Sequence, residues 1–223
     1  MKAKQTIMKV AKILVVDDHP LMREGIVTQI SDEQDLEVCG EAEDVGDAMD
    51  LVKSTQPDLA IIDISLKTGD GLDLVADIKK RCPHVKMLIL SAHQESLYAE
   101  RSLRAGAMGY LNKQQSCQNI LHAIRTVLAG DRFVSPEVAQ RLIGQAVGAH
   151  DSSSGSPVDR LSQRELEVFT LIGEGFTTGE IAKRLMLSPH TIDTHREKIK
   201  IKLNLRNAAE LHRDATCWVM KDA

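Results

Sequence analysis

Two adjacent carboxylates, Asp17 and Asp18, come directly after an apolar run at residues 13–16. Like charges side by side repel one another and shift each other's pKa unless a cation or a hydrogen-bond donor joins them. One interpretation is therefore a cation-binding pair. The other is a solvated strand end that caps the next helix, because His19 and Pro20 follow and resemble a helix start. This stretch alone leaves both interpretations open.

Three more polar residues stand at the ends of apolar runs further along the chain. Asp63 follows LAII, Ser91 follows MLIL and Lys113 follows GYLN. If each run is a strand of a parallel sheet, the strand ends meet at one edge, where functional groups of doubly wound sheets gather. Three carboxylates, a hydroxyl and a lysine then converge. Oxygen ligands of this kind favour a hard divalent cation such as Mg²⁺, which retains several waters.

Apolar runs of strand length alternate with segments of helical periodicity through the first two thirds of the chain. This pattern indicates a parallel sheet covered on both faces, so we expect an α/β fold with a doubly wound, five-stranded parallel sheet. The predicted strands are 12–16, 36–40, 59–62, 85–90 and 109–111. The predicted helices are 20–31, 44–55, 71–82, 95–105 and 117–129, followed by an extra one at 136–147.

The stretch AVGAHDSSSGSPVDR breaks this periodicity with Ser, Gly and Pro, which is typical of a flexible linker. Beyond it every segment is helical. Ser162 and Thr177 each begin a capping-box pattern with a glutamate three residues later, which predicts helices that begin near 163 and 178. Ser188 and Pro189 begin a third helix that runs to about residue 203, and NAAELHRDATCWV forms a fourth.

Composition limits the class of protein. At 223 residues the chain is long enough for two domains, and 27% charged with 43% hydrophobic residues is ordinary for a globular protein. Aromatic residues make up only 3%, which argues against a stacking platform for single-stranded nucleic acid. The four cysteines are scattered and lie in apolar or helical stretches, so we expect reduced core residues with no metal site or disulfide framework.

Several further expectations come from the lengths of apolar runs and from charge. No apolar segment approaches the roughly 18 residues that cross a bilayer, so we expect a cytoplasmic protein without a membrane partner. Met8 is as good a candidate start as Met1. The segment from Lys183 to Arg206 holds seven basic residues and two acidic ones. Without a motif, such a cluster is more often a solvated helix face than a binding surface.

Residues 10–130 resemble the receiver domain of two-component response regulators, because the aspartate pair and the three later polar residues match that family in identity, order and spacing. The resemblance implies a CheY-like fold with Asp63 as the phosphoacceptor. It also implies that Asp18, Asp63 and the backbone carbonyl of Ser65 bind Mg²⁺ directly, with Asp17 acting largely through water.

The same resemblance assigns the remaining residues of the receiver site. Ser91 would hydrogen-bond the phosphoryl group, Lys113 would pair with it, and Tyr110 occupies the switch-aromatic position. Gly71, eight residues after Asp63, fits the family's loop. These residues suit phosphoryl transfer, in which positioning and charge neutralisation matter more than covalent help from the protein.

The tail resembles the LuxR-type helix-turn-helix and begins LSQRELEVFTLIGEGFTTGEIAKRLMLSPHTIDTHREKIKIKL. The whole chain resembles response regulators of the NarL/FixJ kind. We expect a receiver domain at 10–130, a linker at 131–160 that carries one helix, and a small all-α DNA-binding domain at 161–223. The third tail helix would lie in the major groove of B-DNA. The candidate base readers are Thr194, Arg196 and Glu197, with Asp193 as a further candidate, and the candidate phosphate binders are Thr178, Lys183, Lys198 and Lys200.

The predicted function is a DNA-binding response regulator that accepts a phosphoryl group on Asp63 from a histidine kinase and controls transcription at a double-stranded operator as a homodimer. The protein would not be an enzyme beyond autophosphorylation from small phosphodonors and autodephosphorylation. One alternative is a phosphorylation-independent transcription factor whose first domain serves dimerisation or ligand sensing. Another is a phosphatase or transferase that uses Asp63 as a nucleophile. The complete acid pocket favours the phosphorylated response regulator.

Overall fold

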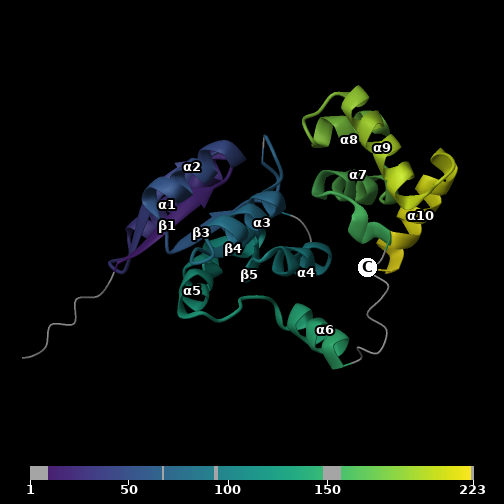
Figure 1. Ribbon diagram of the computed structural model, residues 1–223. Coiled ribbons are helices and arrows are strands. Elements are labelled where there is room, and N and C mark those ends of the chain that lie inside the picture. The colour runs from purple at the N-terminus through teal and green to yellow at the C-terminus, as the bar shows by residue number, and fades with distance from the viewer. Residues whose placement is uncertain (1–9, 67, 93–94, 148–156, 222–223) are drawn as a thin grey trace, which may run out of the picture. The chain divides into compact units, whose positions relative to one another are not determined.

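The computed structural model describes residues 10–66, 68–92, 95–147 and 157–221. The centre of the predicted linker, 148–156, and the alternative start Met8 lie outside the described residues. The chain divides into two compact units, Met1–Gly144 and Gln145–Ala223, and each is described by itself (Figure 1).

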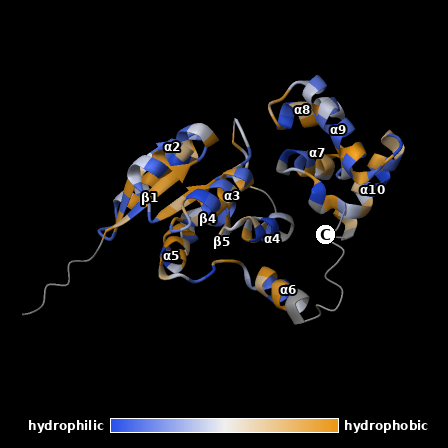
Figure 2. Ribbon diagram, viewed as in Figure 1, coloured by the Kyte–Doolittle hydropathy of each residue, from blue (hydrophilic) through white to orange (hydrophobic). Residues whose placement is uncertain are grey.

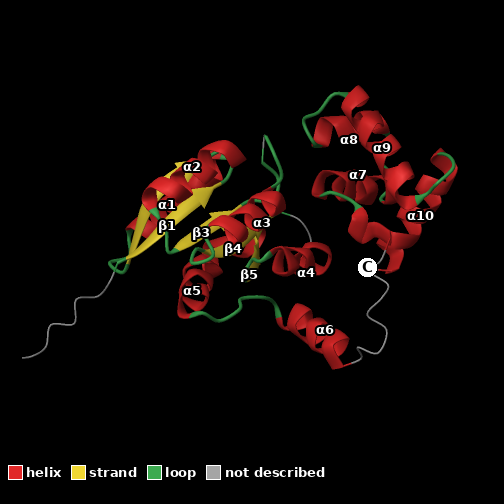
Figure 3. Ribbon diagram, viewed as in Figure 1, coloured by secondary structure: helices red, strands yellow, loops and turns green. Residues whose placement is uncertain are grey.

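The first unit is a five-stranded parallel sheet with strand order β2-β1-β3-β4-β5. Helices alternate with the strands along the chain (Figure 3). The strands are β1 Ala11–Val16, β2 Leu36–Ala42, β3 Leu59–Ile62, β4 Lys86–Ser91 and β5 Gly109–Asn112. The helices are α1 Pro20–Ser31, α2 Val45–Thr55, α3 Gly71–Arg81, α4 Glu95–Ala105, the 3₁₀ turn η1 Lys113–Gln115, α5 Ser116–Ala129 and α6 Pro136–Val147. This strand order confirms the predicted doubly wound fold.

Both faces of the sheet are buried. Ile13 and Val15 of β1 belong to an apolar cluster with residues of α1 and α5, so these two helices cover one face. Leu14 and Val16 alternate with them and point to the opposite face, where they are also fully buried. Figure 2 shows the strands as mostly hydrophobic ribbons. The near-continuous apolar strands of the sequence are therefore explained by helices on both sides.

Parallel pairing brings the carboxyl ends of the central strands together. Val16 pairs with Ile62 and Ile62 pairs with Ile89, so β1, β3 and β4 end at the same edge. The backbone N–H of Asp63 donates to the carbonyl of Val16 over 2.8 Å. Residues that directly follow these strands are consequently neighbours.

The segment after α5 is attached to the sheet and to α4. The N–H of Tyr110 in β5 donates to the carbonyl of Phe133 over 2.8 Å, and the N–H of Phe133 donates to the carbonyl of Met108 over 3.1 Å. The N–H of Ser135 donates to Glu95 Oε1 at the start of α4 over 2.8 Å. The first residues of the predicted linker therefore pack with the receiver unit.

The second unit is entirely helical among the described residues. It contains η2 Pro157–Arg160, α7 Gln163–Gly173, α8 Thr178–Arg184, α9 Pro189–Leu203 and α10 Ala208–Lys221. Both predicted capping boxes are present, at Ser162 and Thr177, and the side chain of Ser188 caps α9. Ile192 and Ile199 of α9 are fully buried, so they form the inner face of this helix.

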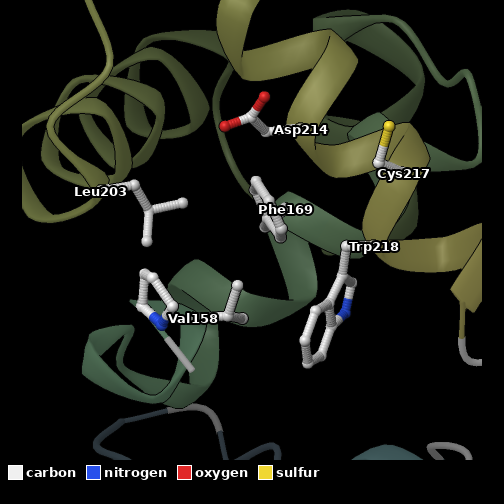
Figure 4. Close-up of a pocket in the computed structure, with 7 residues that line it drawn as sticks. Val158, Phe169, Leu203, Asp214, Cys217 and Trp218 are labelled. Carbon is white, nitrogen blue, oxygen red and sulfur yellow. The ribbon is translucent and has the colours of Figure 1, made fainter. Parts of the chain in front are cut away.

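A pocket of about 330 Å³ opens among η2, α7, α9 and α10 (Figure 4). Phe169, Trp218 and Cys217 line it. Cys217 is exposed, so the expectation that every cysteine is a core residue is wrong for this one, because its side chain lines the open pocket. Cys82 is buried and Cys39 is half-buried, and all three thiols are free.

No helix among the described residues is long and apolar enough to cross a membrane.

Candidate functional site

The ends of β1, β3 and β5 bring two carboxylates and a lysine into contact. Lys113 Nζ lies 2.7 Å from Asp17 Oδ2 and 2.8 Å from Asp63 Oδ2. The side chains of Asp17 and Asp63 are 2% and 3% exposed, so both ion pairs are shielded from solvent. One ammonium group thus bridges two acids that are 46 residues apart in the chain.

Burial sets the protonation properties of this cluster. Burial raises the pKa of Asp63 to about 6, and the neighbouring charge of Asp17 acts in the same direction. Lys113 and the N–H of Ser65 oppose that rise. Burial alone would lower the pKa of Lys113, but the carboxylates of Asp63 and Asp17 outweigh it and raise that pKa. Lys113 therefore keeps its proton beside the two acids, and the Asp63 carboxylate is a stronger base than a solvated aspartate.

Arg23 of α1 holds the backbone of the acid pair. Its Nη1 donates to the backbone carbonyl of Asp17 over 2.6 Å, and its Nε and Nη2 donate to Glu41 and Glu43 over 3.1 Å and 2.9 Å. The side chain of Arg23 is only 14% exposed. This residue was not predicted, because nothing in its spacing distinguishes it from an ordinary arginine on a helix surface.

His19 is a second residue that the sequence analysis missed as part of the site. Its backbone N–H donates to Asp17 Oδ1 over 2.9 Å, and its Nδ1 lies 3.2 Å from Asp17 Oδ1, 2.8 Å from Asp18 Oδ1 and 3.8 Å from Asp63 Oδ2. The residue is also the N-cap of α1, with Pro20 at the first helical position. The stretch therefore begins a helix, as the second interpretation expects, but its carboxylates are buried in an acidic pocket and are not a solvated strand end.

The pocket has the donor set of a divalent cation site. Ligand atoms of Asp17, Asp18, His19 and Asp63 lie within 4.8 Å of one another. Asp18 Oδ1 is buried and has no hydrogen-bond partner among the described residues. Because burying carboxylates this close together is costly, the cluster fits a site in which a cation supplies a compensating interaction.

Ser91 and Tyr110 meet on the side of the site formed by β4 and β5. Both are buried, at 0% and 1% exposure. Burial raises the pKa of the Tyr110 hydroxyl, and a side-chain hydrogen bond with Ser91 opposes that rise. The N–H of Ser65 donates to Asp63 Oδ1 over 3.3 Å, so the loop after β3 folds back on the carboxylate.

In the second unit, the outward positions of α9 carry the candidate DNA contacts. Asp193, Thr194, Glu197 and Lys198 are exposed, as is Lys183 on α8. Two of the candidate DNA-binding residues make side-chain contacts within the second unit. Arg196 is half-buried and its Nη1 donates to Thr178 Oγ1 over 3.3 Å, and Lys200 pairs with Glu197 over 2.8 Å.

Polar groups of α7 contact α9 and the turn before it. Lys202 Nζ lies 2.6 Å from Glu165 Oε2, and Arg164 Nη2 donates to the carbonyl of Leu185 in the α8–α9 turn over 3.1 Å. His195 is half-buried, and burial, followed by the charges of Arg164 and Lys198, lowers its pKa. These contacts fix the orientation of α9 relative to α7.

Two family models match the chain in the same order as the two units. Residues 13–125 match the response regulator receiver domain, and residues 159–215 match the bacterial regulatory proteins of the luxR family. The chain is a DNA-binding response regulator. It is of the NarL/FixJ type, which confirms the family predicted from the five polar positions and from the tail.

Relatives of this response regulator match along nearly their whole length. It is 33% identical over 212 residues to the response regulator GacA of Pseudomonas aeruginosa, which covers 95% of this chain and 98% of the relative. It is 35% identical over 204 residues to the oxygen regulatory protein NreC of Staphylococcus carnosus, with 90% and 94% covered. Among solved structures it resembles RcsB of Salmonella enterica bound to a promoter in the presence of phosphomimetic BeF₃⁻, with a TM-score of 0.57, 25% identity and 93% and 99% covered. Membership of the family implies a kinase partner and DNA.

Proposed function

We propose that Asp63 of this response regulator accepts a phosphoryl group from a histidine kinase. The supporting observation is that the Asp63 carboxylate is buried among other acids and paired with Lys113 over 2.8 Å. An Asp63 oxygen forms the new bond to phosphorus while the bond between phosphorus and the kinase histidine breaks. Lys113 and the Ser91 hydroxyl receive the negative oxygens of the transferred group. A small phosphodonor can replace the kinase, and hydrolysis removes the group.

The acid pocket supports Mg²⁺ as the metal. Asp18, Asp63 and the backbone carbonyl of Ser65 would hold it directly, because hard oxygen ligands suit this ion. Asp17 would act through water, since one of its oxygens accepts from the N–H of His19 and the other pairs with Lys113. When bound, Mg²⁺ neutralises charge on the phosphoryl oxygens.

Ser91 and Tyr110 transmit the effect of Asp63 phosphorylation to the rest of the receiver. A phosphoryl group on Asp63 competes with Tyr110 for the Ser91 hydroxyl, and so weakens one of the contacts that fix the tyrosine. Tyr110 is bonded through its backbone to Phe133, and Glu95 at the start of α4 accepts from Ser135. A change at Tyr110 therefore reaches the face of α4, β5 and α5 and the first residues after α5. This face pairs with a second receiver, so the phosphorylated protein is a homodimer.

The DNA interface is the outward surface of α9 with adjoining residues of α8. Fifteen helical residues span about 22 Å, which suits the major groove. Thr194, Arg196 and Glu197, with Asp193 as a further candidate, lie between the fifth and ninth residues of α9 and read base edges. The phosphate contacts are made by Thr178, Lys183, Lys198 and Lys200.

Intact mass spectrometry after incubation with a small phosphodonor and Mg²⁺ tests the phosphoacceptor. The wild type should gain one phosphoryl group, and Asp63→Asn should gain none. Asp50→Asn is the matched control, because Asp50 is an aspartate on α2 whose side chain is 82% exposed and which should not affect labelling. Labelling of Asp63→Asn would reject the assignment. No labelling of the wild type would favour the phosphorylation-independent transcription factor, and continuous consumption of the donor would favour a phosphatase.

Binding-site selection with the phosphorylated protein tests the DNA interface. Arg196→Ala should relax the preference at one base position. Lys200→Ala should weaken binding to all sequences alike and lower the salt slope by about one unit. If both variants lost affinity uniformly, the division into base readers and phosphate binders would be wrong. Analytical ultracentrifugation with and without phosphodonor measures the proposed dimer.

A further inference from the structure

We propose that Glu197 selects cytosine in the operator, by accepting a hydrogen bond from the N4 amino group of that base in the major groove. The inference rests on the proposed DNA interface and deepens it, since it names the base that one side chain of α9 recognises. It also names the bases that the same side chain rejects.

Glu197 lies on the side of α9 that faces away from the rest of its unit. At about 100° per residue, it is about 140° and 160° around the helix from Ile192 and Ile199, which are fully buried. The side chain of Glu197 is 67% exposed. Thr194 and Ile201 are exposed on the same side of the helix. When α9 lies in the major groove, this is the side that meets the base edges.

An ion pair with Lys200 allows this carboxylate to approach DNA. Lys200 Nζ lies 2.8 Å from Glu197 Oε1, and the lysine side chain is only 20% exposed. An uncompensated carboxylate would be repelled by the phosphates on both sides of the groove. Lys200 offsets that repulsion whatever the base sequence is, whereas the carboxylate of Glu197 distinguishes one base from another.

A carboxylate only accepts hydrogen bonds, which restricts the bases that it can recognise. In the major groove, guanine presents two acceptors, and thymine presents an acceptor and a methyl group. Opposite either base, Glu197 would lose its water without gaining a partner, which is costly. Cytosine and adenine each present an amino donor, but the adenine amino group lies between two acceptors, its own N7 and O4 of the paired thymine. The cytosine amino group has an acceptor on one side only, so cytosine suits Glu197 best.

Replacing the carboxylate by the amide of the same shape tests the assignment. Operators are selected with the phosphorylated full-length protein and with its Glu197→Gln variant. We expect the wild type to select a cytosine at one position of each half-site. Glu197→Gln should select adenine there, because glutamine donates to N7 and accepts from N6 of adenine. Glu174→Gln is the matched control, because Glu174 is exposed at the C-cap of α7 and loses the same charge outside α9. It should keep the cytosine.

An operator that lacks only the amino group measures the contact itself. Replacing the selected cytosine by 2-pyrimidinone removes the N4 amino group and leaves the rest of the base. The affinity of the wild type should fall at least about fivefold, the lower end of the discrimination that a good base contact gives. Glu197→Ala should bind the two operators equally. Equal losses in the wild type and in Glu197→Ala would come from the weaker base pair and would overturn the inference.

Failure of this inference and failure of the proposed DNA interface give different results. If Arg196→Ala relaxes a base preference but Glu197→Gln keeps every preference, α9 reads DNA and Glu197 does not select cytosine. A change of the selected cytosine in Asp193→Asn, without one in Glu197→Gln, would also overturn the assignment. If neither Arg196→Ala nor Glu197→Gln alters the selected sequence, the interface itself is wrong, and the inference with it.

Discussion

Substitution of Gly71 by alanine tests how closely α3 approaches the phosphoacceptor. Gly71 is the first residue of α3, and its N–H donates to the carbonyl of Ile64 over 3.0 Å. A Cβ at this position would lie 2.1 Å from the carbonyl oxygen of Asp63 and 2.8 Å from the Cα of Ile64. Ordinary contacts begin at 3.4 Å, so the helix start and the backbone of Asp63 would have to separate by about 1.3 Å.

That separation should cost both stability and phosphorylation. Forcing an extra carbon into a packed region costs about 1–3 kcal/mol, which exceeds the gain of at most about 1 kcal/mol that alanine brings over glycine in a helix. A misplacement of about 1 Å at a reacting group lowers the rate by up to about 10²-fold. We therefore expect Gly71→Ala to lower the free energy of unfolding of the receiver by about 1–2 kcal/mol and to slow labelling of Asp63 by about 10–100-fold.

The two units can be followed separately in one urea titration. Both tyrosines, Tyr98 and Tyr110, are in the first unit, and the single tryptophan, Trp218, is in the second. Gly25→Ala is the control, because Gly25 lies within α1 and nothing would come within 4 Å of its Cβ. This variant should be more stable than the wild type by about 0.5–1 kcal/mol and label at the normal rate. A Gly71→Ala variant that matches Gly25→Ala in stability and labels as fast as the wild type would contradict the close approach of α3 to Asp63.

Three further predictions concern the buried groups. Burial raises the pKa of Asp63 to about 6 in the folded protein, whereas the carboxyl of the unfolded chain ionises near 3.8. The folded wild type therefore loses stability as pH rises from about 4 to about 6. With a chelator present, Asp63→Asn should stabilise the receiver increasingly over this window. Urea midpoints at pH 4.5 and 7.5 measure this, and a constant difference would contradict it. Gly173→Ala should destabilise the second unit by about 1–3 kcal/mol, since its Cβ would lie 2.4 Å from the carbonyl oxygen of Ala215. Gly179→Ala should not destabilise this unit, because Gly179 lies in the first turn of α8 and its Cβ would meet nothing within 4 Å. Tryptophan fluorescence distinguishes these two variants, and equal midpoints would refute the contact. Lys202→Met should destabilise the same unit by only about 1 kcal/mol, because solvent screens a lysine that is 38% exposed although its partner Glu165 is buried. If Lys202→Met caused the same loss in the Glu165→Gln background, the ion pair would not contribute to stability.

The sequence alone determined the two architectures and the order of their elements. Four of the five strands are short runs of mostly apolar residues and the helices have apolar faces, so burial is recorded in the spacing of residues. The ends of the tail helices were equally predictable, because Ser162 and Thr177 cap them through bonds to residues only three positions away. Convergence of Asp17, Asp63 and Lys113 also followed from the sequence, since parallel strands must end at a common edge.

Only the tertiary structure decided which side chains complete the site. Arg23 reaches Asp17 because α1 lies against β2, and His19 reaches Asp18 through the direction of its ring. The attachment of Ser135 to Glu95 joins segments that are 40 residues apart. Such contacts depend on how helices pack on the sheet and on which rotamer each side chain adopts. A linear pattern of apolar and polar residues records which face is buried, but it does not record which polar side chain meets which across that packing.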